Sequence, residues 1–221
     1  MTMTEPKLET RIKNVIGESA LLQHPFYQAW SAGTLEMEKL QDYARQYYHF
    51  ERSFPRFLSA IHARTESPEI RQLLLENLWD EEHGERNHPA LWLEFAKALG
   101  VSRNEVEQAE PHPETTALID HYLEVATKAP VAEALAALFA YESQVPEIAW
   151  EKIKGLTEHY GLLPDQFEFF SVHLVSDIAH SGAELSAIEE LCEDSDSIVV
   201  AAKEASERLL GFLDGCYGAA A

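Results

Sequence analysis

Helical periodicity runs through almost the whole of this 221-residue sequence and limits the possible folds more than any other feature. Apolar residues recur at spacings of three and four, whereas sustained alternation of apolar and polar residues, which is typical of strands, is nearly absent. The pattern predicts an all-α fold. The predicted helices cover residues 6–17, 24–32, 36–62, 68–98, 114–128, 131–143, 146–160, 165–190 and 194–216.

Length and composition predict a single domain and exclude two kinds of partner. A chain of 221 residues, 46% of them hydrophobic, can bury a substantial core, so residues 1–221 are expected to form one domain. The formal net charge of −21 argues against nucleic acid and anionic membranes, because both need clustered Lys and Arg. The longest apolar stretch, residues 132–141, contains Glu133 and is too short to span a bilayer.

Cysteine usage and the first residues of the sequence indicate a cellular compartment. Cys192 and Cys216 are too few for a disulfide framework. The stretch MTMTEPKLET carries neither a basic region followed by an apolar run nor a lipidation signal. A cytoplasmic location is therefore expected.

One apolar helix carries three potential metal ligands on a single face. In the stretch SVHLVSDIAHS, residues 171–181, the spacings between His173, Asp177 and His180 are four and three residues. An α-helix turns about 100° per residue, so the three side chains lie within roughly one quadrant. Two imidazoles and a carboxylate on a buried stripe need either dedicated hydrogen-bond partners or a cation, and we favour the cation.

Three further residues complete a ligand set for two metal ions. In LWDEEHGERNHP, residues 78–89, Glu81 and His88 are seven residues apart, which predicts that they share one helix face. Glu142 ends a helix rich in small residues. Carboxylates bridge a redox-active metal pair and imidazoles terminate it, which leaves room for water or dioxygen. The predicted ligands are Glu81, His88, Glu142, His173, Asp177 and His180.

Spacing leaves one choice of carboxylate open. Ferritin-like di-iron bundles place Glu three residues before His, a step that Glu85 and His88 fit as well as Glu81 fits the step of seven. His173 would then have no place, and only Glu142 is a convincing carboxylate from a further helix. The pattern therefore departs from ferritin-like sites.

Other polar residues have ordinary structural explanations. Asp80 and Glu82 are expected to form a solvated helix face, as acidic runs usually do. Lone histidines such as His62 and His121 are expected at the surface or as satisfied core residues. None of these four residues is included in the predicted site.

The six predicted ligands, with the motif LWDEEHGERNHPALWLEFAKALG and the element H-x-x-x-D-x-x-H, resemble the haem-oxygenase-like di-metal oxidases, which bind no haem despite their fold. The resemblance covers most of the chain and is closest to 4-aminobenzoate synthases of the chlamydial type. It implies an all-α, haem-oxygenase-like bundle of seven or more helices with a buried site for two metal ions, Fe/Fe or Fe/Mn. It also implies dioxygen as oxidant, an external electron donor as reductant, and a homodimer.

The same resemblance implies roles for residues that are not ligands. Enzymes of this type are thought to make 4-aminobenzoate, a folate precursor, from their own side chains. Tyr27, in HPFYQAW, matches the consumed tyrosine, although Tyr43 is an alternative, and Lys152, in WEKIKG, matches the nitrogen donor. Tyr43 and Tyr141 match aromatic residues near the metals, and Tyr141, beside Glu142, is placed to relay an electron. From the residues alone, Tyr27 is more simply explained as an aromatic core anchor and Lys152 as a solvated helix charge.

Other functions fit parts of the sequence. A di-iron oxygenase acting on an external small molecule needs an apolar pocket, which Phe and Leu side chains could line. Thiaminase-like relatives use a core cysteine nucleophile, but the helix EALAALFAYE contains none. Pyrroloquinoline-quinone synthase relatives bind their substrate with many basic side chains, whereas this chain has only 17 Lys and Arg. A non-enzymatic helical interaction protein would not need six converging ligands.

Overall fold

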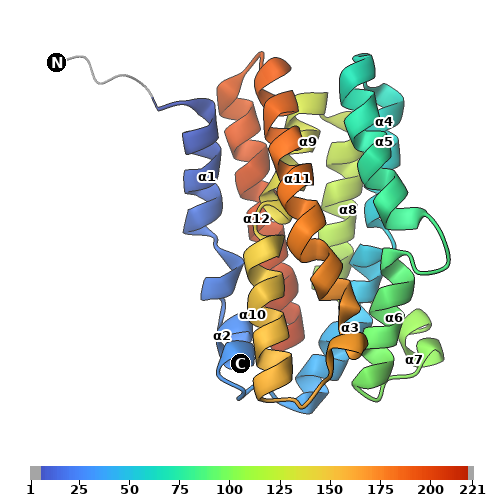
Figure 1. The fold of residues 1–221 in the computed structure, drawn as a ribbon. Coiled ribbons are helices and arrows are strands. Elements are labelled where there is room, and N and C mark those ends of the chain that lie inside the picture. The colour runs from blue at the N-terminus through green and yellow to red at the C-terminus, as the bar shows by residue number, and fades with distance from the viewer. Residues whose placement is uncertain (1–5, 219–221) are drawn as a thin grey trace.

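The computed structural model describes residues 6–218, which form helices joined by short connections (Figure 1). Along this part of the chain no strand occurs, which confirms the predicted all-α fold. The elements are α1 (Leu8–Glu18), η1 (Leu21–Gln23), α2 (Pro25–Ser31), α3 (Met37–Glu51), α4 (Phe54–Arg64), α5 (Pro68–Glu82), α6 (His88–Ala98), α7 (Arg103–Glu107), α8 (Pro113–Lys128), α9 (Val131–Glu142), α10 (Val145–Glu158), η2 (Pro164–Gln166), α11 (Glu168–Glu190) and α12 (Ser195–Tyr217).

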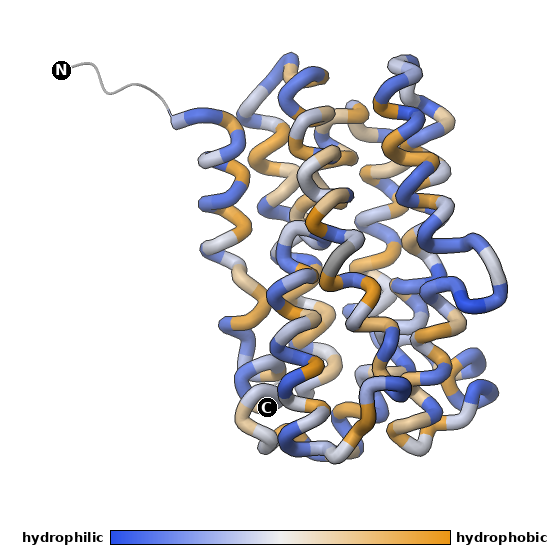
Figure 2. Tube along the Cα trace, in the orientation of Figure 1, coloured by the Kyte–Doolittle hydropathy of each residue, from blue (hydrophilic) through white to orange (hydrophobic). Residues whose placement is uncertain are grey.

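The helix α9 lies at the centre of the bundle. Its residues from 134 to 142 are all buried, and it packs between α11 and α12. Along outer helices such as α1, hydrophobic residues recur once per turn between hydrophilic ones, so each of these helices buries one face only (Figure 2). The buried hydrophobic side chains form one cluster that extends from Ile12 in α1 to Cys216 in α12. None of the described helices has the length and apolar character needed to cross a membrane.

The predicted helix 36–62 is two helices, α3 and α4. Pro55 stands in the first turn of α4 and has no N–H to continue the hydrogen bonds of α3. Residues 52 and 53 make the junction, so α3 ends at Glu51. The break leaves Glu51 inside the bundle, where only 3% of it is exposed.

The predicted helix 68–98 is also two helices, α5 and α6. Gly84 adopts a φ of 83° between them, a left-handed conformation that a helix does not allow. The side chain of Asn87 then accepts a hydrogen bond from the backbone N–H of Ala90 and caps α6. His88 is therefore the first residue of a new helix.

The predicted helix start at residue 68 is confirmed, whereas the predicted start at residue 165 is not. The Ser67 hydroxyl accepts a hydrogen bond from the Ile70 backbone N–H, and Pro68 occupies the first turn of α5. Pro164 instead opens the short 3-10 turn η2, and α11 begins at Glu168 rather than at residue 165.

Candidate metal centre

The six predicted ligands come together from four helices inside the bundle. Five of them are buried, with 2–6% of each residue exposed, and the side chain of the sixth, His180, is 11% exposed. The helices α5, α6 and α9 contribute one residue each, and α11 contributes three. The members are Glu81 of α5, His88 of α6, Glu142 of α9, and His173, Asp177 and His180 of α11.

Glu81 and His88 meet although they do not share a helix. The prediction that they lie two turns apart on one helix is wrong, because the chain breaks over residues 83–87. The Nδ1 atom of His88 nevertheless lies 3.0 Å from Oε2 of Glu81, and the His88 ring lies 4.3 Å from the ring of His173, centroid to centroid. Glu85, the other possible partner of His88, is exposed in the break.

His180 stands between two carboxylates. Its Nδ1 lies 3.7 Å from Oδ1 of Asp177 inside the site, and its Nε2 lies 3.1 Å from Oδ2 of Asp80 at the edge. Asp80 is partly exposed, as expected, but it is paired and not merely solvated. A carboxylate on the outer nitrogen of an imidazole fixes the ring orientation for a metal on the other nitrogen.

Two buried carboxylates and an amide extend the cluster beyond the predicted set. The ligand atoms of Glu51, His88 and His173 all lie within 4.8 Å of one another, a spacing that a metal ion can bridge. At the other end, Glu184 lies beside Glu142, whose Oε1 accepts a 2.9 Å hydrogen bond from the amide of Asn77. The cluster therefore offers more oxygen ligands than the sequence predicted.

Burial controls the protonation of the cluster. Desolvation and then neighbouring carboxylates raise the pKa of Glu81 well above its usual range, and desolvation is also the main cause that raises the pKa of Glu142 to about 7. Desolvation lowers the pKa of His173 to about 4, so its imidazole is neutral, as a metal ligand must be. Desolvation also acts to lower the pKa of His180, but Asp177, Glu142 and Asp80 outweigh it and raise the value to about 9.

The unpaired atoms of the cluster fit metal ions. Buried oxygens without a hydrogen-bond partner are rare in proteins, yet Glu51, Glu81, Glu142 and Asp177 each have one here. A mixed set of carboxylates and imidazoles suits iron and manganese, and metal binding would displace the proton of His180. Together these features define a site in which bound cations would neutralise the buried carboxylates. Without a metal, protons neutralise them.

A group of tyrosines and one lysine adjoins the cluster. Lys152, only 5% exposed, donates a 2.7 Å hydrogen bond to the Tyr43 hydroxyl, and the hydroxyls of Tyr43 and Tyr27 are 3.4 Å apart. The hydroxyls of Tyr47 and Tyr141 form a second pair. The structure thus places Tyr27, Tyr43, Tyr141 and Lys152 together, and it adds Tyr47, which the sequence analysis did not single out.

Burial makes the amine of Lys152 easier to deprotonate and keeps the neighbouring tyrosine hydroxyls protonated. Desolvation lowers the pKa of Lys152 to about 7, against the charge of Glu51, and it raises the pKa values of Tyr27, Tyr43 and Tyr141. The Nζ atom lies 5.4 Å from the centroid of the Tyr27 ring and 4.9 Å from that of Phe170. An amine with a pKa of about 7 is about half uncharged at pH 7, and the uncharged form can act as a nucleophile.

The chamber between these side chains is small and closed. It measures about 20 Å³ and is lined by Tyr27, Tyr141, Lys152 and, on the cluster side, His173. A cavity of about 10–15 Å³ is enough for one water molecule, so the chamber accepts a molecule of that size and no organic ring. Neither Cys192 nor Cys216 lines it, which argues against the thiol chemistry of thiaminases.

The helical bundle and its buried carboxylate–imidazole cluster define a redox metalloenzyme, and comparisons with known proteins agree. A family described as "Iron-containing redox enzyme" matches residues 41–210, so the chain belongs to this family and is an enzyme. A domain of unknown function with a haem-oxygenase-like fold from Shewanella denitrificans has a similar structure, with a TM-score of 0.80 and 18% identity over 98% of this chain and 93% of that chain. The predicted haem-oxygenase-like fold is confirmed.

Two relatives define the branch of the family. The 4-aminobenzoate synthase of Chlamydia muridarum is 44% identical over 202 residues, which are 90% of this chain and 86% of the relative. The 4-aminobenzoate synthase of Nitrosomonas europaea is 42% identical in an alignment of 228 positions that covers 97% of this chain and 93% of the relative. The family resemblance read from the sequence is confirmed, and an enzyme is favoured over an interaction protein.

Proposed function

We propose that this chain is an oxygen-activating di-metal oxidase that makes 4-aminobenzoate from one of its own tyrosines. Tyr27 is the proposed source of the ring and Lys152 the proposed source of the amino nitrogen. Dioxygen is the proposed oxidant, and an external electron donor reduces the two metal ions, Fe/Fe or Fe/Mn. The proposed metal ligands are Glu81, His88, Glu142, His173, Asp177 and His180.

The size and contents of the closed chamber carry this proposal. Sites for small organic molecules usually measure about 300–1,000 Å³, whereas the chamber beside His173 measures about 20 Å³. An external aromatic substrate has no room there. The phenol of Tyr27 and the amine of Lys152 already line the chamber and need not enter from solvent.

The side chains of the chamber have distinct tasks in this scheme. When bound, the metal pair supplies the oxidising power of activated dioxygen. Tyr141, next to the ligand Glu142 in sequence, is placed to pass an electron, and its hydrogen bond to Tyr47 gives the phenolic proton a partner. Lys152 presents an amine that is about half neutral at pH 7, and the surrounding side chains leave room for about one water molecule.

Contacts of Lys152 separate the roles of Tyr27 and Tyr43. The amine is hydrogen-bonded to the Tyr43 hydroxyl at 2.7 Å, which supports a role for Tyr43 in holding the amine. The Tyr27 ring lies at 5.4 Å without such a bond, and the resemblance assigns it as the consumed residue. Consumption of Tyr43 is the alternative, and the Tyr27→Phe variant and peptide mass spectrometry separate the two.

Isotope labelling tests the proposal. Protein made with ¹³C-labelled tyrosine is loaded with Fe(II) without oxygen, transferred to unlabelled buffer, and exposed to oxygen and a reductant. The 4-aminobenzoate released should carry the label, in no more than about one equivalent per chain. Unlabelled product, or many equivalents, would show that the ring comes from elsewhere.

An oxygenase with an external substrate is the second candidate. It is favoured by one observation: a cavity of about 320 Å³, large enough for a small molecule, borders His180 at the other end of the cluster. Such an enzyme should keep its activity when Tyr27 is replaced by Phe.

Three general expectations belong to the same proposal. Residues 1–221 are proposed to form a single domain, since the buried hydrophobic side chains make one cluster. A homodimer in the cytoplasm is proposed from the resemblance. The charge of −21 supports the view that neither nucleic acid nor membrane is a partner.

A further inference from the structure

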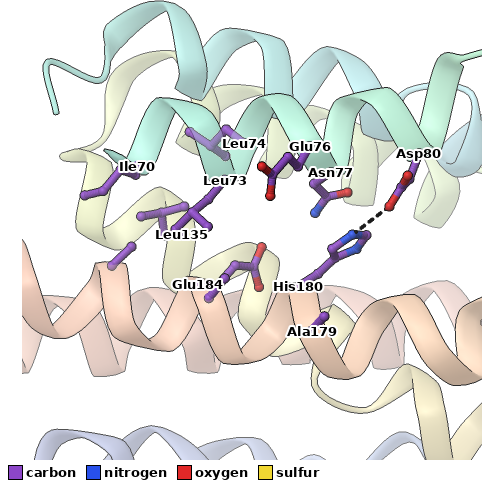
Figure 3. Close-up of a pocket in the computed structure, with 12 residues that line it drawn as sticks. Ile70, Leu73, Leu74, Glu76, Asn77, Asp80, Leu135, Ala179, His180 and Glu184 are labelled. Carbon is purple, nitrogen blue, oxygen red and sulfur yellow. Dashed lines mark hydrogen bonds and ion pairs between the residues drawn. The ribbon is translucent and has the colours of Figure 1, made fainter. Parts of the chain in front are cut away.

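The cavity of about 320 Å³ beside His180 lies between α5 and α11, with α9 beneath it (Figure 3). Leu73, Leu135 and Ala183 are among the apolar residues of its wall. Three carboxyl groups, those of Glu76, Asp80 and Glu184, line it, and the described lining residues include no Lys or Arg, so His180 is the one basic side chain among them. This lining selects against anions.

Two side chains in the cavity carry buried oxygens that no protein donor reaches in hydrogen-bond geometry, and one of them, Glu184, lies against the carboxyl of Glu142. Both carboxylate oxygens of Glu184 and the amide oxygen of Asn77 are buried without a hydrogen-bond partner. Glu184 is 6% exposed and Asn77 is 4% exposed. The nitrogen of Asn77 is bound to Glu142, which fixes the orientation of the amide and leaves its oxygen for a cation or a donor.

The volume and charge of the cavity fit a hydrated divalent ion. Six water molecules at about 30 Å³ each occupy roughly 180 Å³, less than the 320 Å³ present. The net charge of −21 and the acidic lining attract cations to the opening. The chamber at the opposite end of the cluster, at 20 Å³, is too small for such an ion.

The cavity also leads to the buried ligands. Asn77 and Glu184 both line it and both adjoin Glu142, and His180 lies in its wall. An ion held by the oxygens of Asn77 and Glu184 would exchange its waters for the ligands of the cluster one at a time. A buried metal site needs an entry path of this kind.

We propose that this cavity is the loading port for the divalent metal ions, in which Glu184 and Asn77 hold an incoming ion before it passes to Glu142 and His180. The inference rests on the proposed metal-dependent function. It adds a binding step, and two residues that serve it, to the six proposed ligands.

Iron uptake kinetics test the port directly. Metal-free full-length protein is mixed with Fe(II) without oxygen, the reaction is stopped with a chelator at intervals, and protein-bound iron is measured. Ala183→Leu fills the cavity without removing a polar group, and Glu184→Gln replaces a carboxyl that can ionise against a cation with an amide that cannot. Both should slow uptake about tenfold, within the range by which focused charge changes association rates, and A183L should reach the wild-type iron content.

Matched controls lie on the same helix outside the cavity. Ser186→Leu adds similar bulk and Glu189→Gln makes the same Glu-to-Gln change at exposed positions, so both should load like wild type. Circular dichroism tests whether each variant is folded. If A183L does not fold, the uptake rate of E184Q alone tests the port. Wild-type uptake rates in A183L and E184Q would overturn the port and leave the cavity to an organic substrate. Failure of the wild-type protein to bind iron would contradict the proposed function as well.

Discussion

The two cavities at the ends of the ligand cluster differ in what they contain. The chamber at His173 is about 20 Å³ and is walled by tyrosines and Lys152, whereas the cavity at His180 is about 320 Å³ and acidic. The two histidines are seven residues apart on α11, about 10 Å along the helix. One end therefore holds reactive side chains of the chain itself, and the other end is open to material from solvent.

Loss of Asp177, a predicted ligand between the two cavities, should impair both metal binding and product formation. Asp177→Ala removes a carboxylate that interacts with His180, Glu81 and Glu142. Iron content should fall by at least one ion per chain, iron affinity by more than about 100-fold, and product formation with it. Iron titration monitors the change, with the exposed Asp165→Ala as control. Full iron loading in D177A would remove Asp177 from the ligand set.

Tyr27→Phe should affect only the closed chamber. The substitution removes one hydroxyl at 3.4 Å from Tyr43 and leaves the ligand cluster intact, so iron content should match wild type while 4-aminobenzoate becomes undetectable. Stability should change by about 1 kcal/mol at most. The half-exposed Tyr217→Phe serves as control. If Y27F forms 4-aminobenzoate at the wild-type level, the ring comes from Tyr43 or from an external substrate.

The pH dependence of stability tests the burial of Lys152. Its pKa in the folded protein, about 7, lies below the ordinary value of 10.5, so the folded state gives up stability as pH falls from about 10.5 to 7. The free energy of unfolding of metal-free Lys152→Met, relative to wild type, should therefore rise by roughly 2 kcal/mol between pH 9 and pH 7. Urea unfolding measures this change, and the exposed Lys154→Met should show none.

Asp80→Asn should have the smallest effect, at the open end only. The amide keeps a partner for His180 but loses the carboxylate that orients the ring, so iron affinity should fall by about tenfold. Glu82→Gln, exposed on the same helix, should leave affinity unchanged. Equal affinities of D80N and wild type would show that Asp80 does not support a ligand.

Local spacing predicted the part of the site that one helix carries. His173, Asp177 and His180 share a face of α11 because helix geometry alone fixes their directions. Glu184, four residues after His180, continues the same face and could have been found by the same reasoning. Glu51 had no such signal, because it reaches the cluster through tertiary packing at the end of α3.

Helix breaks explain most of what the sequence did not predict. The apolar pattern continues across Pro55 and Gly84, so periodicity alone joined α3 to α4 and α5 to α6. Both breaks lie beside the site: one ends α3 at Glu51, and the other separates Glu81 from His88. Spacing gave no signal for the contact between Lys152 and Tyr43, which are far apart in sequence, and only the family resemblance assigned both residues to the site.

Peptide mass spectrometry on iron-loaded protein, before and after exposure to oxygen and a reductant, tests the central claim most directly. The account predicts that the peptide containing Tyr27 loses that side chain and that the peptide containing Lys152 changes, while Tyr43 is retained. Unchanged peptides in protein that holds its metal ions would contradict the account and would favour an oxygenase that acts on an external substrate.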